Sequence, residues 1–174
     1  MAHTLFPTVL GTCGLAWNEL GLTRFQLPEA NEGKMEHKLT GHERSSSSHI
    51  PRPPWVRRLI EKVQQHLEGK LQDFAAIPLD WSQVSDFQRA VYAQLAAIPP
   101  GSKISYGELA RRIGHEASAA RAVGVAMATN PWPLIVPCHR VVSASGKMTG
   151  YSASGGIRTK TRLLVLEGAE LLSE

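Results

Sequence analysis

The stretch KISYGELARRIGHEASAARAVGVAMATNP, from Lys103 to Pro131, decides the fold class of the second half of this 174-residue chain. Ser105, followed three residues later by Glu108, is a capping-box signature for a helix, and Gly114 is placed to end that helix. Ser118 is a candidate cap for a second helix of small residues, which ends before Pro131 because proline disfavours helix in its predecessor. Two short helices joined by a tight turn are the layout of a helix-turn-helix.

A generic helical hairpin gives the same pattern, so the pattern alone leaves nucleic-acid binding and simple packing both open. The second helix favours nucleic acid, because Ala and Gly leave a slim helix whose backbone can approach a groove or phosphates closely. Arg121, one turn into this helix, can reach outward. Without such a partner, Arg121 is a solvated surface residue and Tyr106 is a partly buried core aromatic.

The next stretch, PWPLIVPCHRVVSASG, places Cys138 directly before a histidine at the end of an apolar run. A buried structural thiol is the ordinary outcome for such a cysteine. A nucleophilic role requires a thiolate, and therefore a nearby cation, base or helix N-terminus. Side chains that are adjacent on a strand point to opposite faces, so contact with His139 requires a turn or a bridging water. Pro137 favours such a departure from regular strand geometry.

A third group is needed to orient the histidine, and Glu167 is the candidate. It lies in the last turn of a predicted helix, TKTRLLVLEG, before a Gly168 cap. A carboxylate there faces the negative end of the helix dipole, at a cost of about 0.3–1 kcal/mol. Locally unfavourable placements are where a function is suspected, and a solvated glutamate is the alternative.

The first half of the chain carries weaker signals. TVLGTCGLAWNELGLTRFQL predicts two short strands around a turn at Asn18–Gly21, with Cys13 packed within them. Residues 29–54 hold few large apolar groups, a serine run and a proline cluster, which predicts a long mobile loop.

Two amphipathic helices are predicted between these regions. The first, WVRRLIEKVQQHLEGK, repeats apolar residues at helical spacing and ends at Gly69. Ser85 and Gln88 form a capping box for the second, which stops before Pro99. The apolar residues of the two helices are Trp55, Leu59, Ile60, Val63, Leu67, Phe87, Val91 and Leu95.

Composition excludes several classes of protein. The hydrophobic content of 43% is typical of a globular chain, and no run of about 18 apolar residues could span a membrane. The N-terminus lacks the features of a secretory signal, which predicts a cytoplasmic protein with free thiols. Two cysteines without a C-x-x-C pair, and seven scattered histidines, make neither a disulfide framework nor a metal site. The net charge of +4 is compatible with a polyanionic partner.

The motifs occur in an order that one protein family shares. PCHRVV preceded by NPWPLIV, with SYGELA and RAVGVAMATN upstream and TGYS and LLVLEG downstream, resembles the O6-alkylguanine-DNA alkyltransferases, also called methylated-DNA–protein-cysteine methyltransferases. The resemblance is dense from Phe87 to Gly168 and looser in the first half. It implies an α/β protein with a small ribonuclease-H-like sheet domain, residues 1–82, and a winged-helix-like helix-turn-helix domain, residues 83–174.

The resemblance implies repair of alkylated guanine in double-stranded DNA by a single irreversible transfer to a cysteine. Cys138 is then the alkyl acceptor, His139 the base acting through water, and Glu167 the group that orients it. Arg140 is a structural support and Asn130 a hinge. The protein is expected to act as a monomer, without a cofactor or metal.

The same resemblance assigns the contacts with DNA. Tyr106 helps to rotate the target nucleotide out of the duplex, and Arg121 fills the vacated space in the base stack. The residues expected at the DNA are Tyr106, Ala119, Ala120, Arg121 and Gly124. The residues expected to line the guanine pocket are Val141, Val142, Tyr151 and Ser152.

One departure and three alternatives remain. YSASGGI is two residues longer than the usual Y-x-G-G, with Ala153 and Ser154 as the candidate insertion, and we expect the extra residues to widen a lid over the pocket. The alternatives are an alkyltransferase-like damage-binding protein, in which another residue replaces the cysteine, a plain helix-turn-helix regulator, and a cysteine hydrolase that turns over many times.

Overall fold

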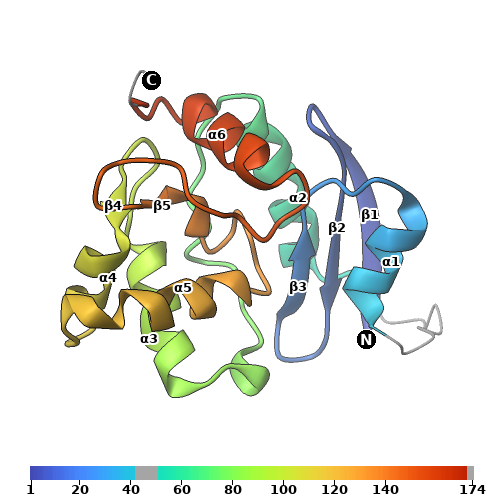
Figure 1. Cartoon of the computed structure of the whole chain (residues 1–174). Coiled ribbons are helices and arrows are strands. Elements are labelled where there is room, and N and C mark those ends of the chain that lie inside the picture. Colours follow the sequence, from blue (N-terminus) through green and yellow to red (C-terminus); the bar gives the residue numbers. More distant parts are fainter. Residues whose placement is uncertain (42–50, 172–174) are drawn as a thin grey trace. The chain divides into compact units, whose positions relative to one another are not determined.

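The computed structural model describes residues 1–41 and 51–171, and the chain divides into two compact units, Met1–Asp80 and Trp81–Glu174 (Figure 1). Charge is distributed unequally between these two parts of the sequence. Lys and Arg number ten against six Asp and Glu in residues 81–174, whereas both kinds number nine in residues 1–80. The whole net charge of +4 therefore belongs to the second unit.

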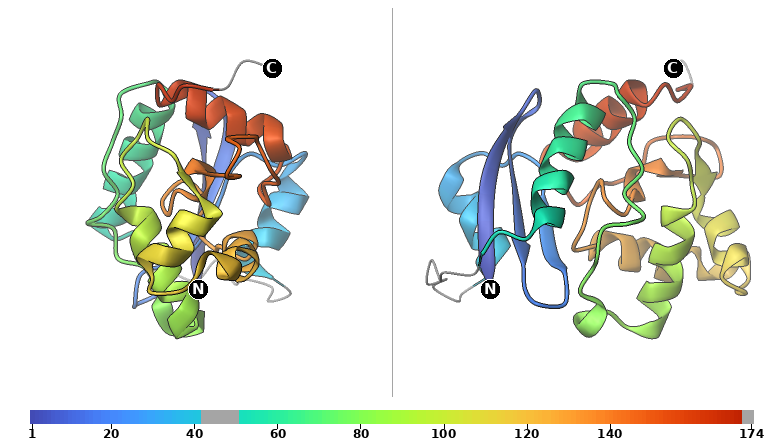
Figure 2. Two further views of the ribbon diagram at one scale, coloured as in Figure 1. Left: turned by 60° about the vertical axis from the view of Figure 1, so that its left-hand side comes forward. Right: turned by 180° about the vertical axis from the view of Figure 1, so that it is seen from behind.

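The first unit is built on a three-stranded antiparallel sheet in the order β1-β2-β3. Its strands are β1 (Ala2–Thr8), β2 (Gly11–Trp17) and β3 (Leu22–Gln26). Helices α1 (Glu32–Thr40) and α2 (Pro54–Leu67) lie on opposite faces of this sheet (Figure 2), which buries the central strand on both sides. The predicted strand pair around Asn18–Gly21 is confirmed as β2 and β3, and β1 is an additional strand that the pattern did not predict.

Helix α1 shows that the prediction of a continuous loop over residues 29–54 is wrong. Asn31 caps this helix by accepting a hydrogen bond from a backbone N–H of the first turn (2.9 Å). Met35 and Leu39, one turn apart, pack against the sheet. The sequence pattern did not predict this helix, because Met35 and Leu39 are the two large apolar residues that it buries. Residues 42–50 of the predicted loop lie outside the described residues.

The two predicted amphipathic helices are confirmed. Helix α2 ends before Gly69 and buries its apolar stripe, which includes Val56, Leu59, Val63 and Leu67. Helix α3 (Asp86–Ala96) begins at the predicted capping box. The Ser85 hydroxyl accepts from the Gln88 N–H (3.2 Å), and the Gln88 side chain accepts from the Ser85 N–H (3.0 Å). This reciprocal pair satisfies two backbone donors that the helix leaves free.

The second unit is mostly helical and contains one pair of short parallel strands. Besides α3, its elements are η1 (Trp81–Gln83), β4 (Ile104–Ser105), α4 (Tyr106–Arg112), η2 (Ala117–Ala119), α5 (Ala120–Ala128), η3 (Cys138–Arg140), β5 (Val141–Val142) and α6 (Gly156–Leu166). Ser105 of β4 pairs with Val142 of β5. This pairing brings the start of α4 beside the segment that follows Cys138. No helix in the described part of the chain is long and apolar enough to cross a membrane.

The predicted fold class, a small sheet domain followed by a helical domain, is confirmed, but two caps differ from the prediction. Ser105 accepts from the Glu108 N–H (3.1 Å), yet the Glu108 carboxylate pairs with Arg112 (2.7 Å) instead of closing a capping box. Ser118 does not cap the second helix. It lies inside the 3₁₀ turn η2, which leads directly into α5, and the N-cap of α5 is Ala119.

Trp132 is the central side chain of the core of the second unit. Its ring is fully buried and meets Tyr92 and Trp81 edge to face, with ring centroids 6.0 and 5.1 Å apart. The Tyr92 hydroxyl donates to the Ala126 carbonyl of α5 (2.7 Å). Packing and hydrogen bonding therefore fix the chain six residues before Cys138 relative to α3 and α5.

Candidate active site

Cys138 stands after a tight turn and not on a regular strand. Pro137 has φ −81° and ψ 66°, the conformation of an inverse γ-turn, and the Cys138 N–H donates to the Val136 carbonyl (2.8 Å). The chain continues as the 3₁₀ turn η3. The predicted departure from strand geometry at Pro137 is confirmed, so Cys138 and His139 are not held on opposite faces as strand neighbours are.

Leu134 adopts a left-handed backbone conformation four residues before the cysteine. Its φ is 75°, and among the described residues it is the one residue other than glycine with a positive φ. This conformation costs an L-residue about 1–2 kcal/mol. Burial of the Leu134 side chain in the core offsets this strain. The Val136 N–H donates to the Trp132 carbonyl (2.8 Å), and this hydrogen bond closes the turn that contains Leu134. The path of the chain into the site is thereby fixed.

Asn130 connects the end of α5 with the sulfur. Its side-chain carbonyl accepts from the Trp132 N–H (2.9 Å). Its amide group donates to the Val136 carbonyl (2.9 Å) and to Cys138 Sγ (3.3 Å). A hydrogen bond donated to sulfur favours the thiolate. The residue predicted as a hinge is therefore also a direct partner of the candidate nucleophile.

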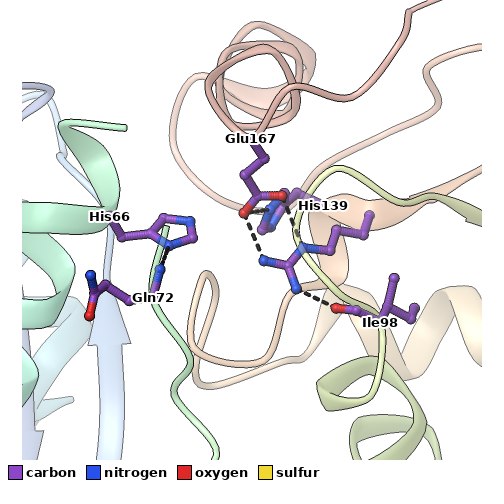
Figure 3. A network of polar contacts seen from close by, with 6 residues as sticks. His66, Gln72, Ile98, His139 and Glu167 are labelled. Carbon is purple, nitrogen blue, oxygen red and sulfur yellow. Dashed lines mark hydrogen bonds and ion pairs between the residues drawn. The ribbon is translucent and has the colours of Figure 1, made fainter. Parts of the chain in front are cut away.

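His139, Arg140 and Glu167 form a buried polar network (Figure 3). His139 Nε2 lies 3.0 Å from Glu167 Oε1. Arg140 donates from Nε to Oε2 (2.9 Å) and from Nη2 to Oε1 (2.8 Å) of the same carboxylate, and from Nη1 to the Ile98 carbonyl. Glu167 follows the last residue of α6 and is not solvated. The positive charge of Arg140 offsets the unfavourable position of this carboxylate at the negative end of the helix.

A pocket of about 340 Å³ opens beside the cysteine. Its lining residues are Tyr106, Gly124, Met127, Ala128, Cys138, Gly150, Tyr151 and Ser152. This volume lies in the range of sites that hold small organic molecules. Val141 and Val142, which were expected in the lining, are instead buried in β5 and are not among these residues. The pairing of β5 with β4 takes both side chains into the core, and a contact of this backbone with the guanine stays a prediction.

Comparison with known proteins assigns the chain to a family. The family described as 6-O-methylguanine DNA methyltransferase, DNA binding domain, matches residues 86–169. The methylated-DNA–protein-cysteine methyltransferase of Mycobacterium tuberculosis strain H37Rv is 44% identical over 72% of this chain and 73% of its own length. That of Methanosarcina acetivorans is 33% identical over 97% of this chain and 99% of its own length. The chain belongs to the methylated-DNA–protein-cysteine methyltransferase family.

Solved structures of methyltransferases agree with this assignment and confirm the family that the order of motifs predicted. The crystal structure of Mycobacterium tuberculosis OGT in complex with DNA has a TM-score of 0.74 at 36% identity, over 96% of this chain and 93% of that chain. The O6-methylguanine-DNA methyltransferase of Pyrococcus kodakaraensis strain KOD1 has a TM-score of 0.68 at 30% identity, over 97% of this chain and 99% of that chain.

The electrostatics of this methyltransferase's candidate nucleophile combine opposing effects. Burial raises the pKa of the Cys138 thiol, and the hydrogen bond from Asn130, the positive charge of Lys160 and the Tyr151 hydroxyl lower it in part. Burial and the neighbouring Cys138 charge raise the pKa of Tyr151 well above its usual value. The thiol is therefore shielded from water, yet polar groups that favour its ionised form surround it.

The residues expected at DNA are divided between the pocket and the surface of α5. Tyr106 and Gly124 line the pocket. Arg121 is exposed, and Ala119 and Ala120 are half-buried around the start of α5. Val125, one turn after Arg121, is 62% exposed, so the outer face of α5 presents small and apolar groups beside a single arginine.

Sequence reasoning missed Lys160 and several residues of the pocket. Met127, Ala128 and Gly150 line the pocket without any local signal in the sequence. Lys160 did have a signal, because it shares the buried stripe of α6 with Leu163 and Leu164 at helical spacing. A lysine on the apolar face of an amphipathic helix is unusual and could have been singled out.

The two extra residues after Tyr151 do not line the pocket. Its lining ends at Ser152 in this segment. The Ala153 carbonyl accepts from the Gly156 N–H (3.0 Å), and the Ser154 carbonyl accepts from the Thr159 hydroxyl (2.7 Å). Ala153 and Ser154 therefore form the turn that starts α6, and the expectation of a widened lid gains no support from their position.

In the described residues no cluster of three or more His, Cys, Asp or Glu could hold a metal ion.

Proposed function

We propose that this protein repairs O6-alkylguanine in double-stranded DNA by moving the alkyl group onto Cys138 in one irreversible displacement. The observation that carries the proposal is a single sulfur that lies at the wall of a 340 Å³ pocket and accepts a hydrogen bond from Asn130. The residue next to it, His139, is held by a buried carboxylate. No such combination is needed for a packed structural thiol.

The bonds formed and broken in this displacement account for every atom without a cofactor. The thiolate sulfur attacks the alkyl carbon, the carbon–O6 bond breaks, and its electron pair remains on the guanine, which takes up a proton. The new sulfur–carbon bond is a thioether, and nothing in the pocket provides a route back. One protein molecule therefore repairs one lesion.

His139, supported by Glu167, would accept the proton of the thiol. Because Nε2 of the imidazole is held by Glu167, the proton would pass to Nδ1 through water, and the carboxylate would stabilise the resulting imidazolium. Arg140 would hold Glu167 in place through its two-pronged contact with the carboxylate. This arrangement lets a buried thiol lose its proton at the moment of transfer.

DNA would bind on the unit that carries the net positive charge. An O6 substituent is inaccessible inside a duplex, so the nucleotide must be extruded into the pocket, at a cost of a few kcal/mol. The slim outer face of α5 would allow close approach, and the exposed Arg121 would replace the extruded base in the stack. Tyr106, which lines the pocket, would contact the rotated nucleotide. The protein would then act as a monomer in the cytoplasm, on nucleoid DNA.

Stoichiometry tests the proposal. A limiting amount of protein is incubated with an excess of duplex that contains O6-methylguanine, and the restored guanine is counted. We expect one guanine per protein molecule and no further reaction. Continued turnover would indicate a hydrolase, and tight binding without repair would indicate a damage-binding protein or a regulator.

A further inference from the structure

Tyr92 is a fully buried side chain that the mechanism above does not use. It lies on α3, which packs against α5 (Figure 1). Its hydroxyl donates to the Ala126 carbonyl (2.7 Å), and its ring meets Trp132 edge to face. A phenylalanine would present the same apolar ring to the core. What the tyrosine adds at this position is therefore the hydrogen bond to α5.

The carbonyl that Tyr92 binds lies in the last turn of α5, where carbonyls have no partner farther along the helix. The Asn130 N–H donates to the Met127 carbonyl (3.1 Å). The Ala126 carbonyl accepts instead from two hydroxyl groups, those of Tyr92 (2.7 Å) and Thr129 (3.1 Å). The bond from Tyr92 joins the end of α5 to α3, and the bond from Thr129 closes the turn that leads to Asn130.

Asn130 needs an accurate position because its side-chain polar atoms have separate partners. The amide group donates to a backbone carbonyl (2.9 Å) and to Cys138 Sγ (3.3 Å), and the side-chain carbonyl accepts from the Trp132 N–H (2.9 Å). Tyr92 contacts the chain on both sides of Asn130. Its hydroxyl binds Ala126, four residues earlier, and its ring meets Trp132, two residues later. Both contacts therefore bear on where the amide meets the sulfur.

We infer that Tyr92 is a positioning residue for alkyl transfer, which holds the end of α5 through the Ala126 carbonyl and thereby sets the Asn130 amide against the Cys138 sulfur. A hydrogen bond donated to sulfur favours the thiolate, so Tyr92 acts on the thiol through Asn130. The inference rests on the proposed function of Cys138 as alkyl acceptor. It deepens that function by giving α3 a part in the stabilisation of the thiolate.

The Tyr92 hydroxyl contributes no charge at neutral pH. Burial and the neighbouring Cys138 charge raise its pKa, and hydrogen bonding lowers it only in part. The other titratable groups around the sulfur are Lys160 of α6, His139 of η3, Tyr151 of the pocket wall, and Glu167, which acts on Tyr151. Tyr92→Phe leaves all of these groups in place, so it removes a hydrogen bond and no charge.

Tyr92→Phe tests the inference, because it keeps the ring and deletes the hydroxyl. The free protein reacts with iodoacetamide between pH 6 and 9, and peptide mass spectrometry reports the rate at Cys138. Sulfur displaces iodide, and the thiolate is the reacting form. We expect labelling to slow roughly threefold to tenfold at neutral pH, with the pH profile displaced to higher pH. An undisplaced profile in the folded variant would overturn the inference.

A second background shows whether Tyr92 acts through Asn130. Asn130→Ala removes the amide that donates to the sulfur, and it should displace the profile by itself. Tyr92→Phe should then add no further displacement, because two residues that act in series have non-additive effects. An equal displacement in both backgrounds means that Tyr92 affects Cys138 by another route, which contradicts the inference.

Thr129→Val covers the case in which Tyr92→Phe does not fold, because Thr129 is exposed and its hydroxyl binds the same Ala126 carbonyl. Labelling of Cys138 should slow roughly twofold, again with a profile displaced to higher pH. Thr40→Val is the matched control, since the Thr40 hydroxyl likewise donates to the carbonyl four residues earlier at the end of a helix, α1 (2.9 Å). No displacement with Thr129→Val, or an equal one with Thr40→Val, contradicts the inference. These measurements omit DNA, so they are independent of the stoichiometry that tests the proposed repair.

Discussion

The two cysteines of this chain are both buried, and the difference between them shows what makes a thiol reactive. Cys13 is fully buried in β2 of the sheet, and the Thr8 hydroxyl lies 3.8 Å from its sulfur. Burial raises its pKa to about 12, which the Thr8 contact only partly opposes. Cys138 is as well shielded, with 4% of its surface exposed, but it has a pocket and several stabilising partners.

Burial alone therefore does not distinguish a structural thiol from a nucleophile. What distinguishes them is whether the groups around the sulfur can stabilise a negative charge on it, and whether a pocket gives a substrate access to it. At Cys13 the sulfur lies inside a sheet, where burial is the largest influence on its pKa. At Cys138 the sulfur lines a pocket and accepts a hydrogen bond from the Asn130 amide, and the next residue, His139, contacts a buried carboxylate.

The largest effect is expected from Cys138→Ser. A serine hydroxyl ionises far less readily than a thiol, so transfer should be abolished. Binding to alkylated duplex should persist, because contacts with phosphates and grooves dominate affinity. Single-turnover repair and a gel-shift titration measure the two properties. Loss of both together would make Cys138 a structural residue like Cys13.

Glu167→Gln should slow transfer by about tenfold to a hundredfold at neutral pH. The imidazolium of His139 loses its counter-charge, so proton removal from the thiol becomes harder. The rate should recover in part as the pH rises, because free thiolate then accumulates without the base. The variant should also lose about 3 kcal/mol of unfolding free energy, since Arg140 is left buried without its partner.

Glu170→Gln is the matched control for that experiment, because Glu170 is an exposed carboxylate three residues farther along the chain. Rates are measured from pH 6 to 9 and stability by urea unfolding. A rate that is insensitive to Glu167→Gln at every pH would remove this carboxylate from the mechanism.

Arg121→Ala should slow repair of duplex DNA by about tenfold and leave the reaction with the free base, O6-methylguanine, almost unchanged, because only the duplex requires extrusion. Arg111→Ala, which removes an exposed arginine from α4, provides the comparison for a simple loss of charge. Equal losses on the two substrates would end the assignment of Arg121 as the side chain that replaces the extruded base.

The smallest effect on repair is expected from Cys13→Ala, which should leave the transfer rate unchanged and lower the unfolding free energy by about 1 kcal/mol.

The raised pKa of Cys13 also makes the stability of the folded protein depend on pH in the alkaline range. Its pKa is about 12 in the folded chain and about 9 when unfolded, so its contribution to stability is complete below pH 9 and is lost between pH 9 and 12. Cys13→Ala should make this alkaline decline shallower in urea unfolding, and an identical slope would show that another group causes it.

Sequence patterns predicted those features that short-range chemistry determines. The capping box at Ser85 and Gln88, the slim helix before Asn130 and the order of motifs around Cys138 all follow from residues close together in the chain. The association of His139 with Glu167 could be proposed as well, because a carboxylate at a helix C-terminus is locally unfavourable.

Features that depend on tertiary packing could not be predicted in the same way. The left-handed Leu134 is stable only because the core encloses its side chain, which no local pattern reveals. The pairing of β5 with β4, which buries the side chains of Val141 and Val142, joins segments that are far apart in the chain. Helix α1 has too few apolar residues to be recognised without the sheet on which it packs.

Peptide mapping after repair tests the contrast between the two cysteines most directly. The protein is incubated with excess duplex that carries O6-methylguanine, digested, and analysed by mass spectrometry for methyl groups on each cysteine. The account predicts one methyl group per molecule, located entirely on Cys138, with Cys13 unmodified. A methyl group on Cys13, or repair that leaves both thiols unmodified, would contradict it.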